Sequence, residues 1–174
     1  QGVYKVGGIG TVPAGRVACG SARPGSATSA LTSVVRSLES FHDSRGSAAA
    51  GEWVGLAVKG VPAWRVRRGD VVSDAGDQPA RFAVRFTARI RSRPGCLRPG
   101  YVALVHVHTA HAPCRLVSSR RCDTKGTGEM LGERLDEQVG LQAGDVAEAV
   151  FEPLHPRLVV EPFREYPVLG RFVV

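Results

Sequence analysis

The chain has 174 residues, of which 43% are hydrophobic and 22% are charged, and this ordinary globular composition allows one medium domain or two small ones. Its formal net charge of +7 favours acidic partners such as nucleic acid, although an excess of arginine could equally do no more than solvate the surface. The N-terminus has no signal-peptide pattern and no apolar run reaches transmembrane length, which predicts a cytoplasmic protein without a membrane partner.

The first half of the chain opens on the glycine-rich segment Val6–Gly10. This segment lacks the G-x-x-x-x-G-K-[ST] pattern of a phosphate-binding loop and leads into a segment that cannot open a helix, so it predicts a β-turn. The apolar residues of Leu31–Phe41 recur at helical spacing and, on periodicity alone, predict an amphipathic helix. Trp53–Lys59 predicts a strand.

The segment Asp74–Ala80 combines Gly, Pro and Asp, which predicts a boundary between one domain at 1–78 and another at 79–174. The clearest strand follows at Phe82–Arg91, where apolar and polar side chains alternate strictly. Further strands are predicted at Tyr101–His108, Val146–Phe151 and Leu158–Val160. Between them, Arg120–Gln138 is polar and contains glycine, which predicts a long loop or excursion. Short strands between Gly- and Pro-rich turns predict an all-β fold.

No catalytic site is predicted for this chain. The G-x-S-x-G motif of hydrolases is absent, and without any Asn the N-K-x-D signature of GTPases is impossible. His106, His108 and His111 resemble a metal cluster, but polar surface histidines on a strand explain them better, so no metal site is predicted. Four scattered cysteines without a C-x-x-C motif indicate free thiols.

The best basic patch is the polar face of the strand predicted at Phe82–Arg91, which carries Arg85, Arg89 and Arg91. Arginines on one sheet face could contact phosphate groups, and a merely solvated face is the equal alternative. The pattern contains no reader of base identity.

Four segments of the chain resemble translation elongation factor 1-alpha, of the elongation factor Tu/1-alpha family, in that family's order and spacing. They are "VYKVGGIGTVPAGRV" (Val3–Val17), "VRRGDVV" (Val66–Val72), "PGYVALVHVHTAHAPCRL" (Pro99–Leu116) and "YPVLGRFVV" (Tyr166–Val174). The resemblance covers the family's second and third domains and implies two consecutive small β-barrels, the second lacking its final strand. It also implies that Val34–Phe41 is a strand, against the helical periodicity.

The resemblance further implies roles for particular residues. His42, Arg45 and Glu52 match the region that faces the 3′ end of tRNA, and His108, Thr109 and His111 match the region near the tRNA arm. The implied partners are aminoacyl-tRNA, the nucleotide exchange factor, the ribosome and actin. GTP and Mg²⁺ belong to the family's GTPase domain, so this chain is expected to hold no cofactor and to be no enzyme by itself.

The chain also departs from the family pattern, because the GTPase domain and the last strand of the third domain have no counterpart in it and arginine has largely replaced lysine. The resemblance makes a tRNA-binding part of an elongation factor the first hypothesis. The alternatives are a diverged interaction or scaffold protein with cytoskeletal contacts, and a fragment without function.

Overall fold

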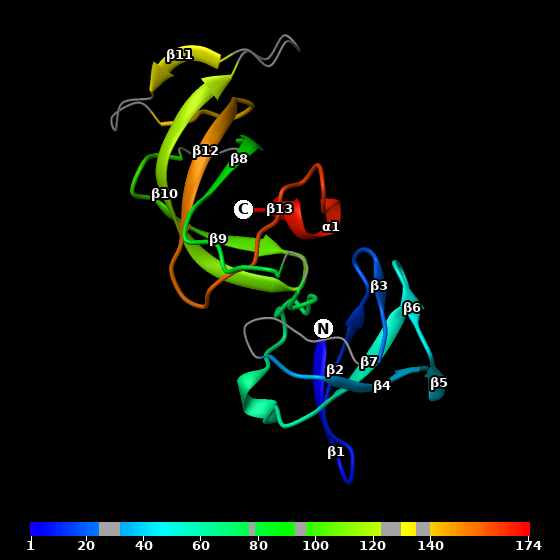
Figure 1. Cartoon of the computed structure of the whole chain (residues 1–174). Coiled ribbons are helices and arrows are strands. Elements are labelled where there is room, and N and C mark those ends of the chain that lie inside the picture. The colour runs from blue at the N-terminus through cyan, green and yellow to red at the C-terminus, as the bar shows by residue number, and fades with distance from the viewer. Residues whose placement is uncertain (25–31, 77–78, 93–96, 123–129, 135–139) are drawn as a thin grey trace. The chain divides into compact units, whose positions relative to one another are not determined.

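The computed structural model of the chain describes residues 1–24, 32–76, 79–92, 97–122, 130–134 and 140–174 (Figure 1). Its contacts divide it into two compact units. Unit 1 comprises Gln1–Phe82, Val107–Ala110 and Val159–Phe172, and unit 2 comprises Ala83–His106, His111–Leu158 and Val173–Val174. The boundary between 1–78 and 79–174 stays a prediction. The expected all-β class is confirmed, because strands form nearly all of the regular structure.

Unit 1 is built on a five-stranded antiparallel sheet in the order β1-β2-β7-β4-β5. The strands are β1 (Gly2–Val6), β2 (Gly10–Arg16), β4 (Val35–Ser40), β5 (Asp43–Arg45) and β7 (Trp53–Val58). The short strands β3 (Ser21–Ala22) and β6 (Ala48–Ala49) pair with each other, and a 3₁₀ turn, η1, spans Ala63–Arg65. Gly7–Ile9 is the β1–β2 turn, as predicted.

The core of unit 1 comes from the inner faces of these strands. Its buried members are Val35, Leu38, Ala48, Val54, Leu56 and Val58. Leu38 is fully buried, and a leucine removed from water in this way contributes about 2 kcal/mol.

The helix that periodicity predicts at Leu31–Phe41 is wrong, because Val35–Ser40 forms strand β4. The register of β4 against β7 shifts between Val35 and Ser37, so the strand carries a β-bulge at Arg36. A bulge adds one residue to the strand, which brings residues three apart to the same face. Val35 and Leu38 are therefore both buried, and the bulge explains why they are spaced as in a helix. The strand implied by the family resemblance is confirmed.

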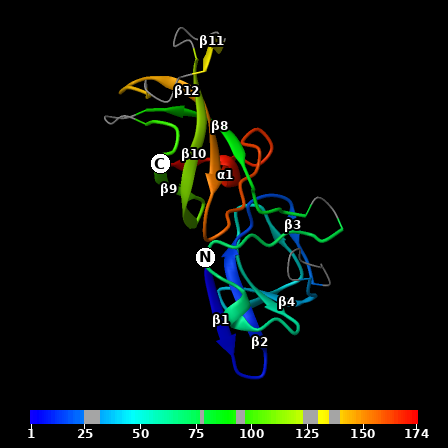
Figure 2. The ribbon, with the colours of Figure 1, turned by 90° about the vertical axis from the view of Figure 1, so that its left-hand side faces the viewer.

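A second large sheet, most of whose residues belong to unit 2, has the order β13-β9-β10-β12-β8, with β11 paired to β10. The strands are β8 (Phe86–Arg91), β9 (Val102–Val107), β10 (Ala110–Cys122), β11 (Met130–Arg134), β12 (Val146–Pro153) and β13 (Phe172–Val173). Figures 1 and 2 both show β10 as a long curved strand with β11 beside its far end. The buried Phe151 stacks on Phe86 with ring centroids 5.5 Å apart.

The strand predicted at Phe82–Arg91 begins four residues late, at Phe86. Its ladder with β12 ends at the pair Phe86–Phe151, and Val84 is 81% exposed. Leu158–Val160 forms one isolated bridge, between Phe82 and Val159, rather than a strand. The other three predicted strands are confirmed, within two residues at each end.

The long loop predicted at Arg120–Gln138 is wrong where the structure describes it, since β10 runs to Cys122 and β11 occupies Met130–Arg134. Residues 123–129 and 135–138 of that prediction lie outside the described residues. Cys19, Cys114 and Cys122 are free thiols, as expected. Among the described residues, no helix has the length and apolar character needed to span a membrane.

Candidate functional site

The turn between β4 and β5 is the most unusual backbone feature of unit 1. Phe41 and His42 form a two-residue hairpin loop, and both have positive φ, 51° and 70°. Such loops suit the twist of a hairpin, but Asn and Gly normally fill them because a bulky residue is strained there. Phe41 is also 85% exposed, so burial does not offset the strain. Strain held at an exposed aromatic side chain points to a surface with a function.

The β4–β5 turn lies beside the start of β7 and the end of β2. Ser40 Oγ donates a hydrogen bond of 2.8 Å to the carbonyl oxygen of Trp53, the first residue of β7. Trp53 pairs in register with Arg16, the last residue of β2. Three neighbouring strands therefore present Arg16, Phe41, His42 and Trp53 at one end of the sheet, which we name the hairpin end.

The three residues predicted to face the tRNA 3′ end sit on and beside the hairpin end. His42 belongs to it and is exposed, and Glu52 directly precedes Trp53. The Glu52 carboxylate accepts a hydrogen bond of 2.6 Å from the Ala49 amide, so it already helps to fix the turn before β7. Arg45 is exposed on β5, opposite Leu38.

The residues predicted to lie near the tRNA arm occupy the β9–β10 hairpin. His108, with φ 42°, and Thr109 form its turn. The His108 ring is half-buried, and its Nε2 atom lies 3.2 Å from the carbonyl oxygen of Val159, at hydrogen-bond distance. Burial lowers the pKa of the His108 imidazole, and this hydrogen bond opposes that effect only in part. The His111 ring lies 5.6 Å from the His106 ring. The described part of the chain holds no group of three or more His, Cys, Asp or Glu side chains that could bind a metal.

The three arginines of the predicted basic patch have different surroundings. Arg89 and Arg91 lie on the exposed face of β8, whereas Arg85 precedes the strand and pairs with Glu152 at 3.2 Å. Arg89 is directly opposite Glu148, which is opposite Arg120 on β10. Acidic side chains therefore interrupt this surface.

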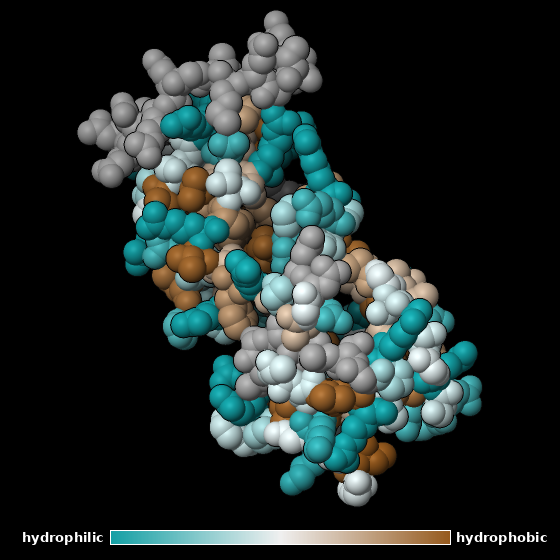
Figure 3. All heavy atoms as spheres, in the orientation of Figure 1, coloured by the Kyte–Doolittle hydropathy of each residue, from teal (hydrophilic) through white to brown (hydrophobic). Residues whose placement is uncertain are grey.

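Apolar side chains are also exposed on unit 2. Val102 and Leu104, on the outer face of β9, are 45% and 48% exposed. Figure 3 shows hydrophobic residues interrupting the hydrophilic surface of both units. Exposure of an apolar residue is therefore common in this chain, and the combination with backbone strain distinguishes Phe41.

Residues 85–174 match the family model described as GTP-eEF1A C-terminal domain-like. The chain belongs to the elongation factor 1-alpha family. It is 41% identical over 181 residues to elongation factor 1-alpha of Eimeria bovis and 38% identical over 180 residues to that of Plasmodium falciparum. All of this chain aligns in both comparisons, and it spans 51% and 40% of the length of these two relatives.

The solved structures confirm the fold. Sup35 complexed with GMPPNP superposes with a TM-score of 0.81 and 24% identity over 98% of this chain and 41% of that one. Translation elongation factor SelB from Methanococcus maripaludis, in its apo form, superposes with a TM-score of 0.68 and 22% identity. That comparison covers 92% of this chain and 35% of SelB. At these identities the likeness shows the fold alone.

The glycine-rich turn of this family member does not fit a GTP phosphate group. Gly7–Ile9 joins β1 to β2, whereas a phosphate-binding loop leads into a helix whose N-terminal amides hold the anion. The described residues around this turn therefore offer no cradle for the nucleotide.

Two aromatic residues of the hairpin end escaped the sequence analysis. Periodicity makes Phe41 the last apolar residue of a helix, and the strand predicted at Trp53–Lys59 gives Trp53 no role beyond its first position. The strand pairing is what reveals them, because it places Phe41 in a two-residue turn, where a side chain has no inward position.

Proposed function

We propose that this chain is a tRNA-binding part of an elongation factor 1-alpha-like protein, and that the hairpin end receives the aminoacylated 3′ end of tRNA. Membership of the family supports the proposal. The observation that carries it is the exposed Phe41 in a strained turn, next to Trp53 and two groups, Arg16 and His42, that can donate hydrogen bonds.

The chemistry of the hairpin end suits a single-stranded nucleic acid end. Exposed aromatic rings provide surfaces on which unpaired bases stack, and each stacked base contributes about 1–3 kcal/mol. The Arg16 guanidinium, whose Nε bonds the Gly51 carbonyl at 2.9 Å, is held in place to meet a phosphate. The tRNA arm would meet His108, Thr109 and His111, and Arg89 and Arg91 would add non-specific attraction.

Delivery of tRNA to the ribosome and nucleotide exchange are roles we propose for the whole protein, since this chain spans about half or less of its relatives. In this proposal the chain binds without catalysing a reaction, and GTP with Mg²⁺ is held elsewhere.

A titration with aminoacylated and uncharged tRNA, at low and moderate salt, tests the proposal. We expect the chain to prefer the aminoacylated form and to keep that preference as salt rises, because stacking and end recognition are less screened than phosphate attraction. Phe41→Asn should lower affinity for aminoacyl-tRNA about tenfold.

Phe41→Asn separates binding from folding, because Asn accepts positive φ and should leave the hairpin intact. Val84→Asn is the matched control, since Val84 is an equally exposed apolar residue outside the hairpin end. Equal binding of both tRNA forms, vanishing as salt rises, would refute the proposal and favour a diverged interaction protein.

A further inference from the structure

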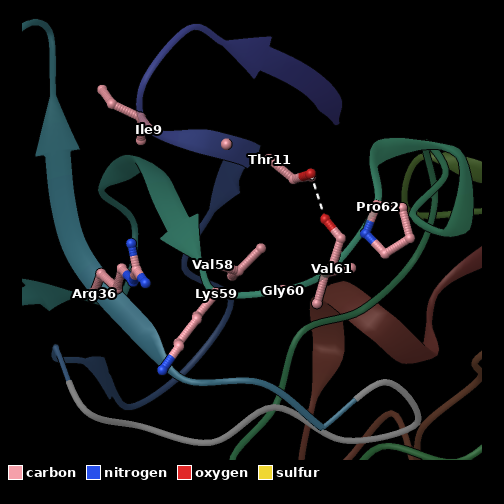
Figure 4. A pocket seen from close by; sticks show the side chains of 9 residues that line it. Ile9, Thr11, Arg36, Val58, Lys59, Gly60, Val61 and Pro62 are labelled. Atoms are coloured by element: carbon pink, nitrogen blue, oxygen red, sulfur yellow. Dashed lines mark hydrogen bonds between the residues drawn. The ribbon is translucent and has the colours of Figure 1, made fainter.

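A pocket of about 390 Å³ opens at the end of the first sheet opposite to the hairpin end. The β1–β2 turn, β4 and the segment after β7 form its walls. Its lining residues are Ile9, Gly10, Thr11, Arg36, Val58, Lys59, Gly60, Val61 and Pro62. Figure 4 shows Arg36 and Lys59 on one side of the pocket and Val61 and Pro62 on the other. All nine residues belong to unit 1.

The β-bulge in β4 accounts for the position of Arg36. The register against β7 shifts between Val35 and Ser37, so Arg36 is the extra residue of the strand. A bulge locally bends the strand and re-aims the side chain of the extra residue. Arg36 consequently lines the pocket, although its neighbours Val35 and Leu38 point into the core.

Hydrogen bonds hold the backbone on both sides of the pocket, at Lys59 on one side and at Val61 on the other. The Lys59 amide donates to the Val34 carbonyl oxygen at 3.1 Å, and Ser33 Oγ donates to the Lys59 carbonyl oxygen at 2.6 Å. Thr11 Oγ1 donates to the carbonyl oxygen of Val61. Both sides are therefore ordered without a ligand, which lowers the entropy cost of binding one.

The charges of the pocket have one sign. Arg36 and Lys59 are both exposed, no acidic residue lines the pocket, and within the described residues no ion pair of either cation is recorded. Ile9, Val61 and Pro62 add an apolar surface beside them. Two cations, one on β4 and one just after β7, suit an anion whose oxygens point in several directions. The apolar surface suits the organic part of the molecule that carries the anion.

We propose that this pocket binds the phosphate group of a small phosphorylated molecule. The site is separate from the hairpin end, because Arg36 lies near the start of β4 and His42 follows the end of that strand. Phosphate binding in this pocket does not require tRNA binding at the hairpin end.

The test is an NMR titration of backbone amides with inorganic phosphate and with adenosine 5′-monophosphate, against sodium chloride at equal ionic strength. We expect saturable shifts at Ile9–Thr11 and Lys59–Pro62 with both phosphates. Tighter binding of the nucleotide identifies an organic phosphate as the ligand, and equal binding identifies phosphate itself. Arg36→Gln and Lys59→Gln should each weaken binding about tenfold.

Two further variants complete the test. Ile9→Asp places a negative charge at the pocket and should abolish binding, whereas Lys5→Gln removes an exposed cation of β1 outside the pocket and should leave affinity unchanged. The proposal is overturned if sodium chloride produces the same shifts, if the shifts spread over the basic surface, or if Lys5→Gln weakens binding as much as Arg36→Gln does.

Discussion

His108 combines three features within one turn. Its φ of 42° lies in the left-handed region, its ring is half-buried, and its Nε2 contacts a backbone carbonyl oxygen. Burial disfavours the imidazolium and lowers the pKa of His108 below its usual value of 6.5, and the Val159 hydrogen bond opposes this only in part. The neutral ring is therefore the form that the fold accommodates.

The lowered pKa of His108 predicts a pH-dependent stability. The folded state takes up this proton less readily than the unfolded state does, so the contribution is complete above pH 6.5 and is lost as pH falls through 6.5 toward the lower folded pKa. His108→Asn, which accepts positive φ, should gain stability relative to the parent chain as pH falls. Urea unfolding at pH 5 and pH 8 measures this difference.

The exposed His106 provides the control, since His106→Asn should show no comparable gain. A stability difference between His108→Asn and the parent chain that stays constant from pH 8 to pH 5 would contradict the expected role of burial.

At the scale of the element, the short helix α1 (Pro167–Gly170) ends against backbone. A Cβ atom at Gly170 would lie 2.5 Å from the Glu161 carbonyl oxygen and 2.6 Å from the Phe163 Cα atom. Backbone atoms cannot rotate away as a side chain can, so Gly170→Ala should lower the free energy of unfolding by about 1–3 kcal/mol.

Gly7→Ala is the matched control for this substitution, because nothing lies within 4 Å of a Cβ atom at Gly7 and its φ is not in the left-handed region. Its stability should be unchanged or slightly higher. Equal urea midpoints for Gly170→Ala and the parent chain would show that the segment Glu161–Phe163 can shift.

Strands were predicted best from the sequence where apolar and polar residues alternate without interruption along a paired strand. In β8, exposed Arg89 and Arg91 alternate with half-buried residues as expected. The prediction failed at β4 because a bulge changes the spacing of buried residues from two to three, and no local signal separates that spacing from a helix. The strand predicted for β8 also began too early, at Phe82. Alternation continues to that residue, but hydrogen-bonded pairing with β12 ends at Phe86.

The candidate site was predicted in part. His42 was selected through the family resemblance, whereas Phe41 and Trp53 depend on which residues fall in the turn and which strands neighbour it. The pocket at Arg36 was missed for a similar reason. Lys59 lies after β7 and Ile9 in the β1–β2 turn, so their proximity to Arg36 follows from the strand order alone.

At the scale of the whole molecule, the buried side chains fall into sets that belong to different units. Leu38, Leu56 and Val58 pack in the core of unit 1, whereas Leu116 and Phe151 are fully buried in the sheet of unit 2. A cavity acts on the residues that line it, and Leu→Ala in a core costs about 2–5 kcal/mol. We therefore expect each unit to lose stability when its own core is truncated.

Native-state hydrogen exchange of a reciprocal pair of variants measures this expectation. Leu38→Ala should lower the protection of amides in β2, β4 and β7 and leave that of β10 and β12 unchanged, and Leu116→Ala should do the reverse. Equal losses in all five strands from either variant would mean that the chain unfolds as one cooperative block. In that case a variant that destabilises the hairpin end would also unfold β8, and the tRNA affinity of the two surfaces could not be measured separately.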